Sequence, residues 1–148
     1  MDVSPDSDPH LRRAAYAAEV AAEIGIDEPM IARLVHAFYG KLRSDALLGP
    51  VFAARVSDWD THLPRMCAFW SSVALMSGRY HGTPMRAHLS LPIGPEHFAR
   101  WLAVWRETAE AECPPAAASR FIALAGRIAE SLAMGIAVRN DAVPAART

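Results

Sequence analysis

Cysteine is scarce in this chain. Its 148 residues include only Cys67 and Cys113, which lie far apart and form no C-x-x-C pair. The sequence therefore lacks the signatures of zinc fingers and of thioredoxin-like redox sites. Two thiols in apolar surroundings are typical of a reducing compartment, so we expect a cytoplasmic protein.

An excess of charge of one sign is also missing. Fifteen Lys and Arg residues oppose sixteen Asp and Glu residues, which leaves a formal net charge of -1. Without a strong positive field, we expect no binding to nucleic acid or to an anionic membrane. No segment reaches the ~18 consecutive apolar residues of a membrane helix. The acidic N-terminus has no signal-peptide pattern.

The sequence contains helical patterns and no strand-like alternation. Hydrophobic residues make up 52% of the chain, which suits one globular domain of this length. The patterns predict an all-α protein, with four long helices in two layers, one short helix between them and an extra helix in front. The expected divisions are a flexible start at 1–9, the extra helix at 10–26, the helical domain at 27–138 and a flexible tail at 139–148.

Local signals mark the ends of these helices. Gly25 should stop the first helix, and Asp27 should cap the next one. Gly49 and Pro50 should prevent helix formation, so we expect a tight apolar corner at 47–52. Gly78 should end the helix that begins near residue 57.

One short helix is the most informative stretch. Thr83 can cap it, Pro84 suits its first position, and Pro92 limits it to about two turns. So short a helix is not stable alone and needs tertiary contacts or a ligand.

This short helix carries His88 in an apolar setting, beside Met85, Leu89 and Leu91. A neutral imidazole can bind a metal through one nitrogen while the other donates to a backbone carbonyl. A buried structural histidine bonded to a loop carbonyl would produce the same pattern. Spacing alone leaves both interpretations open.

Three other side chains combine an apolar body with a hydrogen-bond donor. Tyr39, His62 and Trp101 lie on or beside the inner faces of three different expected helices. If they converge, they could donate hydrogen bonds to a small polar ligand on a metal. If they do not converge, they are core residues with polar ends, which is the commoner fate.

These features occur together with a series of short motifs. In order along the chain they are Phe38-Tyr39, Leu48-Gly49-Pro50-Val51-Phe52, Trp59-Asp60-Thr61-His62, Phe69-Trp70, Tyr80, Pro84, His88-Leu89-Ser90-Leu91-Pro92, Phe98 and Trp101. With these motifs and gaps, the chain from about 27 to 137 resembles the group III truncated haemoglobins.

The resemblance implies a truncated globin fold, a two-over-two helical sandwich with a short proximal helix around haem b. It makes His88 the proximal iron ligand, places Tyr39 and His62 on the distal side, and puts Trp101 at the pocket border. The expected pocket and core walls are Phe38, Phe52, Met66, Phe69, Trp70, Met85 and Phe98, and the candidates for haem propionate contacts are Arg79, Tyr80 and Arg86.

The resemblance also implies a function. A bacterial monomer or weak dimer would reversibly bind oxygen, NO, CO and cyanide, and it would use an unidentified reductase for redox chemistry on oxygen or NO. Alternatives are a haem enzyme such as a peroxidase or NO dioxygenase, a haem-based sensor, or a haem-free helical interaction module. Pro64 follows His62 closely, which leaves open whether His62 faces the ligand, swings out as a gate or binds the iron.

Overall fold

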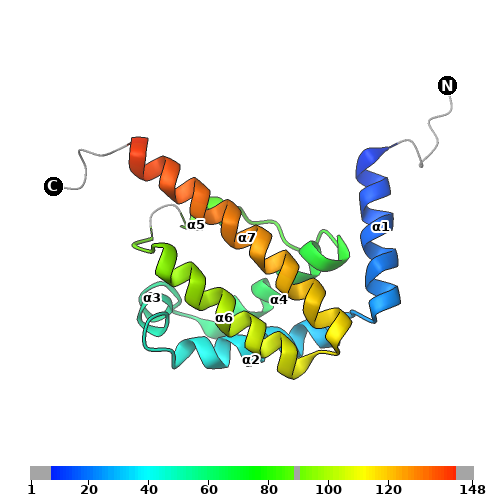
Figure 1. Cartoon of the computed structure of the whole chain (residues 1–148), viewed down its shortest axis with the longest axis horizontal. Coiled ribbons are helices and arrows are strands. Elements are labelled where there is room, and N and C mark those ends of the chain that lie inside the picture. The colour runs from blue at the N-terminus through cyan, green and yellow to red at the C-terminus, as the bar shows by residue number, and fades with distance from the viewer. Residues whose placement is uncertain (1–7, 89–90, 143–148) are drawn as a thin grey trace.

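The fold is entirely helical in the part of the chain that the structure describes. The computed structural model describes residues 8–88 and 91–142, which form seven helices and no strand. The helices are α1 (Pro9–Ile24), α2 (Glu28–Arg43), α3 (Gly49–Arg55), α4 (Trp59–Leu75), α5 (Pro84–His88), α6 (Pro95–Glu112) and α7 (Pro115–Ala142), as Figure 1 shows. The predicted all-α class is confirmed.

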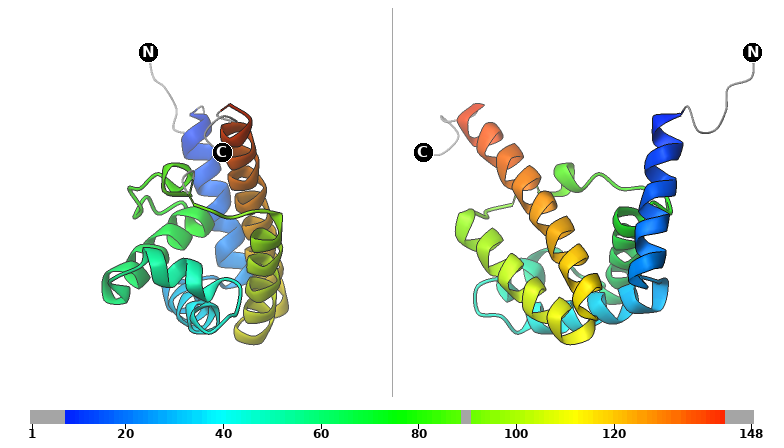
Figure 2. Two further views of the ribbon diagram at one scale, coloured as in Figure 1. Left: turned by 90° about the vertical axis from the view of Figure 1, so that its left-hand side faces the viewer. Right: turned by 45° about the vertical axis from the view of Figure 1, so that its right-hand side comes forward.

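Four long helices form two layers. Helices α2 and α4 pack together in one layer, and α6 and α7 run side by side in the other. The layers meet where α2 lies on α6 and where α4 lies on α7 (Figure 2, left). The short helix α5 packs on α7, and α1 contacts α4. This is the two-over-two arrangement expected from the motifs.

Aspartates begin three of the helices. The carboxylate of Asp27 accepts a hydrogen bond from the Met30 N–H at 3.0 Å. Asp8 and Asp58 cap α1 and α4 in the same way. Each carboxylate satisfies an N–H group that has no partner inside its helix. Gly25 ends α1 with a φ of 87°, a conformation that suits glycine.

The structure corrects three of the predicted boundaries. The expected corner at 47–52 is instead the start of α3, because Pro50 lies in the first turn, where a missing N–H costs nothing. Helix α4 ends at Leu75 rather than at Gly78, since Met76 takes the left-handed conformation, with a φ of 54°. Helix α7 extends to Ala142, four residues beyond the predicted end.

Trp105 of α6 lies at the centre of the core and joins the two layers. Its ring stacks on Trp70 of α4 at 4.2 Å and meets Phe38 of α2 edge-on at 4.8 Å. On α7, the Phe121 ring lies 6.3 Å away, and the Phe121 carbonyl accepts a hydrogen bond from Trp105 Nε1 at 3.0 Å. Trp105 is fully buried. One side chain therefore touches all three of the other long helices of the sandwich.

Helix α7 qualifies the expectation that no segment could cross a membrane. By length and composition alone, its residues Pro115–Asn140 could do so, with a mean hydropathy of 1.6. The core helix of a soluble protein passes the same test. Here α7 packs against α4, α5 and α6, so the finding carries little weight as evidence for a membrane.

We predict that Gly49→Ala destabilises the fold by about 1–3 kcal/mol, the usual cost of forcing an atom into a packed site. A Cβ at this buried position would lie 2.8 Å from the carbonyl oxygen of Arg43, which belongs to the backbone and cannot swing away. Urea denaturation measures the change. In contrast, a Cβ at Gly40, an exposed position of α2, meets nothing within 4 Å, so Gly40→Ala should stabilise the protein by roughly 0.5–1 kcal/mol. Equal effects of both variants would refute the steric argument.

Candidate functional site

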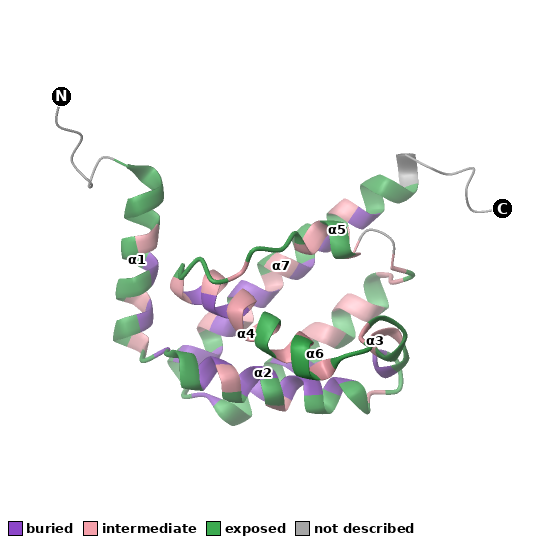
Figure 3. Ribbon diagram, turned by 180° about the vertical axis from the view of Figure 1, so that it is seen from behind, coloured by how far each residue is buried: buried purple, intermediate pink, exposed green. Residues whose placement is uncertain are grey.

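Helix α5 presents His88 in a defined orientation. Its Nδ1 lies 2.6 Å from the carbonyl oxygen of Pro84, one turn earlier. Because a carbonyl only accepts, Nδ1 carries the proton and Nε2 keeps a free lone pair. The side chain is half-buried, and α5 has no fully buried residue (Figure 3). His88 can therefore offer Nε2 to a metal, as the sequence predicted it could. Leu89 and Ser90, which follow it, lie outside the described residues.

A glycine lets α5 approach α7 closely. A Cβ at Gly135 would stand 2.3 Å from the Sδ atom of Met85. Met85 is half-buried there, one turn before His88. The predicted wall residue thus packs α5 onto α7 and helps to set the position of the histidine.

A second cluster brings together residues from α2, α3 and α4. The rings of Tyr39 and His62 meet edge to face at 5.3 Å. Phe52 lies 5.6 Å from Tyr39, and Trp59 lies 5.4 Å from His62. We call these four residues the distal cluster. The structure therefore unites Tyr39 and His62, whose convergence the sequence could not show.

The distal cluster keeps its polar atoms in forms that can donate. Burial lowers the pKa of His62, with a smaller contribution from the charge of Arg65, so the imidazole is neutral at pH 7. Burial also raises the pKa of Tyr39, so its phenol keeps its proton. Among the described residues, only the Nε2 of His62 is a buried side-chain nitrogen or oxygen without a hydrogen-bond partner. A buried polar atom without a hydrogen-bond partner destabilises the fold unless a ligand supplies that partner.

Trp101 belongs to a neighbouring group of rings. It lies 5.7 Å from Phe38 and runs parallel to Trp105 at 6.1 Å. Phe38 in turn contacts Tyr39 at 5.3 Å, so Trp101 is joined to the distal cluster through one ring. Of the other predicted wall residues, Trp70 is buried in the core, and the half-buried ones are Phe52, Met66, Phe69 and Phe98.

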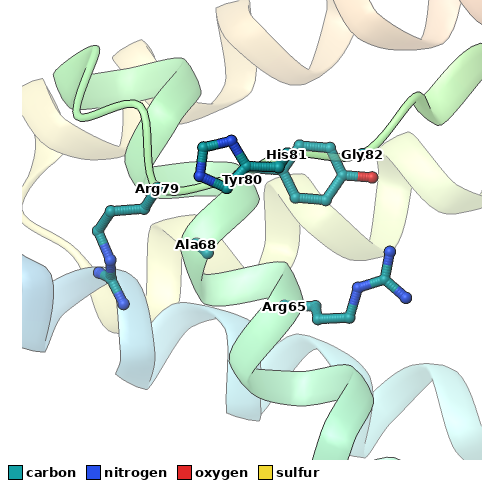
Figure 4. A pocket seen from close by; sticks show the side chains of 6 residues that line it. All are labelled: Arg65, Ala68, Arg79, Tyr80, His81 and Gly82. Carbon is teal, nitrogen blue, oxygen red and sulfur yellow. The ribbon is translucent and has the colours of Figure 1, made fainter.

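A cavity of about 260 Å³ opens beside α4, lined by Arg65, Ala68, Arg79, Tyr80, His81 and Gly82 (Figure 4). Figure 4 shows the Tyr80 hydroxyl and the Arg65 guanidinium extending to one side and Arg79 to the other. Arg79 forms an ion pair with Glu28 of α2. Arg86, the other arginine predicted to contact propionates, is exposed on α5.

Two residues near the site were missed in the sequence. Arg65 was not a candidate, although it follows His62 by one helical turn and faces the same cavity as Tyr80. Trp59 appeared only as a motif residue, yet its ring contacts both His62 and Tyr39. The guanidinium of Arg43 lies 4.5 Å above the Trp59 ring. The signal for both residues was their i, i+3 spacing from His62.

No group of three or more His, Cys, Asp and Glu side chains within 8–88 and 91–142 could hold a metal ion. A metal bound through His88 alone would need its other ligands from elsewhere, and the four nitrogens of a porphyrin are such a set. The half-buried His88, the unpartnered His62 and the apolar rings between the layers fit that group.

Comparisons with known proteins identify the family. No protein-family model matches the chain. A group 3 truncated haemoglobin of Campylobacter jejuni is 39% identical over 88 residues, which are 56% of this chain and 69% of that protein. The crystal structure of a group III truncated haemoglobin from Campylobacter jejuni matches with a TM-score of 0.70 and 32% identity, covering 75% of this chain and 91% of that one. The chain belongs to the group III truncated haemoglobins.

Proposed function

We propose that the chain binds haem b through His88 and reversibly binds oxygen, NO, CO and cyanide on the distal side. Its globin relatives imply a haem cofactor and small gaseous ligands. The observation that carries the proposal is the hydrogen bond from His88 Nδ1 to the Pro84 carbonyl, which leaves Nε2 available for iron.

The chain's own residues fit the cofactor. When bound, haem would supply an iron atom with one coordination position open to a diatomic ligand. His88 would hold that iron, and the half-buried rings of Phe69 and Phe98 would wall the porphyrin. Arg65 and the Tyr80 hydroxyl line an open cavity and would receive the negatively charged propionates.

The distal cluster would set how long a ligand stays. Tyr39 and His62 can each donate a hydrogen bond to a ligand that carries partial negative charge. Such charge-assisted bonds are typically worth about 1.5–3 kcal/mol each. Every ~1.4 kcal/mol slows release tenfold. Slow release suits redox chemistry on oxygen or NO, with a reductase partner, better than bulk oxygen delivery.

The partner of His88 favours ligand binding over peroxidase chemistry. A peroxidase needs a strongly electron-donating proximal histidine, which a carboxylate partner would provide. Here Nδ1 donates to the Pro84 carbonyl, an uncharged acceptor. The neutral hydrogen bond orients the imidazole without giving it anionic character.

The proposal is tested by adding haem to the purified protein and recording its visible spectrum. We expect one equivalent of haem to produce a Soret band, and the ferrous protein to show a shifted band with CO and with oxygen. A protein that shows no Soret band after haem is added would refute the proposal and would favour the haem-free interaction module.

We predict that Tyr39→Phe raises the oxygen dissociation rate on the order of ten- to a hundredfold, because it deletes one charge-assisted hydrogen bond. Phenylalanine keeps the ring contacts with Phe52 and His62. Stopped-flow mixing of the oxygenated protein with CO measures the rate. The matched control is Tyr16→Phe on α1, where the side chain is 66% exposed. An oxygen dissociation rate unchanged in Tyr39→Phe would exclude Tyr39 as a donor to the ligand.

A further inference from the structure

A closed ring of hydrogen bonds ties α2 to the segment between α4 and α5. The Ser71 hydroxyl lies 2.5 Å from Glu28 Oε1 and 2.7 Å from the Ser77 hydroxyl. The Ser77 hydroxyl accepts the backbone N–H of Arg79 at 3.4 Å. The Arg79 guanidinium then pairs with the second oxygen of Glu28, which closes the ring.

The chemistry of Glu28 sets the direction of every bond in this ring. An ionised carboxylate only accepts, so Ser71 must donate to Glu28. The Ser77 hydroxyl must then donate to the Ser71 hydroxyl, and the lone pairs of the Ser77 oxygen are free to accept the Arg79 N–H. Each hydroxyl donates once and accepts once, so the bonds polarise one another in the same sense.

The buried part of the ring matters more than its exposed ion pair. The side chains of Arg79 and Glu28 are 49% and 45% exposed, so their charge attraction is largely screened. Ser71 is fully buried. Its hydroxyl needs both of its partners, because water does not replace them.

The ring holds the backbone that enters the cavity. Met76 reverses the chain after α4, and the Tyr80 N–H donates to the Ser72 hydroxyl at 2.9 Å. Together these bonds place Tyr80 against Phe69 at 5.3 Å and above Arg65 and Ala68 (Figure 4). The same segment continues directly into α5 and His88.

We propose that Glu28, Ser71 and Ser77 are positioning residues that control how tightly the chain retains haem. The inference rests on the proposed function. The ring fixes one end of the segment that leads to α5, and the contact of Met85 with α7 fixes the other. Loosening the ring frees the end that carries Tyr80, so that α5 and His88 are held at the Met85 end alone.

The test compares two variants at the exposed position 77, where both should fold. Ser77→Ala removes the hydroxyl, and Ser77→Thr keeps it. The readouts are the rate of haem transfer to excess apomyoglobin, the CO dissociation rate, and hydrogen exchange of residues 77–82 in the haem-free protein. Glu28→Ala, which removes the acceptor of the Ser71 hydroxyl, is a third variant, and Glu107→Ala, which breaks the exposed Lys41–Glu107 pair, is its control.

We expect Ser77→Ala and Glu28→Ala to lose haem roughly three- to tenfold faster, the range set by one net hydrogen bond. Ser77→Thr and Glu107→Ala should match the parent protein, and CO dissociation should not change. Haem loss unchanged in both Ser77→Ala and Glu28→Ala would overturn the inference. So would equally fast loss from the Ser77→Thr variant. If the parent protein takes up no haem, the proposed function fails. Separately, an unaltered hydrogen-exchange rate of residues 77–82 in Ser77→Ala would show that the ring does not order this segment.

Discussion

Replacing His88 with alanine should abolish the spectrum of a histidine-ligated ferrous haem and weaken haem binding at least about a hundredfold. Losing a hydrogen-bond partner of a metal ligand typically costs roughly 10–100-fold in metal affinity, and losing the ligand itself should cost more. His88 stands on a helix with no buried residue, so the substitution removes little packing. Alanine is also a favourable helix residue, so α5 gains propensity. A haem titration followed by visible absorption measures the effect.

Two further measurements make the His88 result specific. Imidazole added to the His88→Ala protein should occupy the vacated space and restore the spectrum, because it supplies the same nitrogen. His36→Ala is the matched control, since His36 is exposed on α2 and belongs to neither the distal cluster nor α5. An unchanged ferrous spectrum in His88→Ala would mean that another residue ligates the iron, and His62, with its unpartnered Nε2, would be the first to examine.

The environment of His88 explains how much of the site could be predicted from sequence. Thr83, Pro84 and Pro92 bound a helix of about two turns, and a histidine four residues after a helix start can reach the first carbonyl. Local spacing therefore predicted the short helix, and the general chemistry of imidazole suggested a backbone carbonyl as the partner of His88. Pro84 is that partner at 2.6 Å. The decision between a metal ligand and a structural histidine needed the family, because both use this hydrogen bond.

Sequence spacing within a single helix cannot predict contacts between segments that are distant in the sequence. Tyr39 and His62 are 23 positions apart, and only the packing of α2 on α4 brings their rings to 5.3 Å. The pairing of Arg79 with Glu28 spans 51 positions. The resemblance made Arg79 a candidate for haem propionate contacts. Its guanidinium pairs with Glu28 of α2, and it lines the same cavity as Tyr80 and Arg65 (Figure 4). Local sequence signals gave no indication of either arrangement.

The missed helix α3 has a different cause. Gly49 and Pro50 each disfavour the interior of a helix, and together they signal a break. At the first turn, however, proline lacks only an N–H that has no helical partner, and Gly49 fits against the Arg43 carbonyl where a Cβ would not. Helix α3 forms because Gly49 and Pro50 are its first two residues. The Gly-Pro pair alone does not reveal whether it lies at the start of a helix or in its interior.

Trp105→Ala should destabilise the protein by about 3–5 kcal/mol, the cost expected for deleting a large buried aromatic side chain. Against the 5–15 kcal/mol typical of a whole domain, that loss would leave the haem-free protein close to unfolding. The reason is the position of the ring, which touches Phe38, Trp70 and Phe121 on the three other long helices. The substitution also leaves the buried Phe121 carbonyl without its donor.

Trp101→Ala provides the comparison for Trp105, since both replace a tryptophan on α6. Trp101 is only half-buried and contacts two rings, Phe38 and Trp105. We therefore expect it to cost less than half as much as Trp105→Ala in urea denaturation of the haem-free protein, followed by circular dichroism at 222 nm. Similar losses for the two variants would contradict the central role of Trp105. A larger loss at Trp105 in the haem-free protein would show that core packing joins the two helical layers without haem. The helices that carry the distal cluster and α5 would then be packed before haem binds.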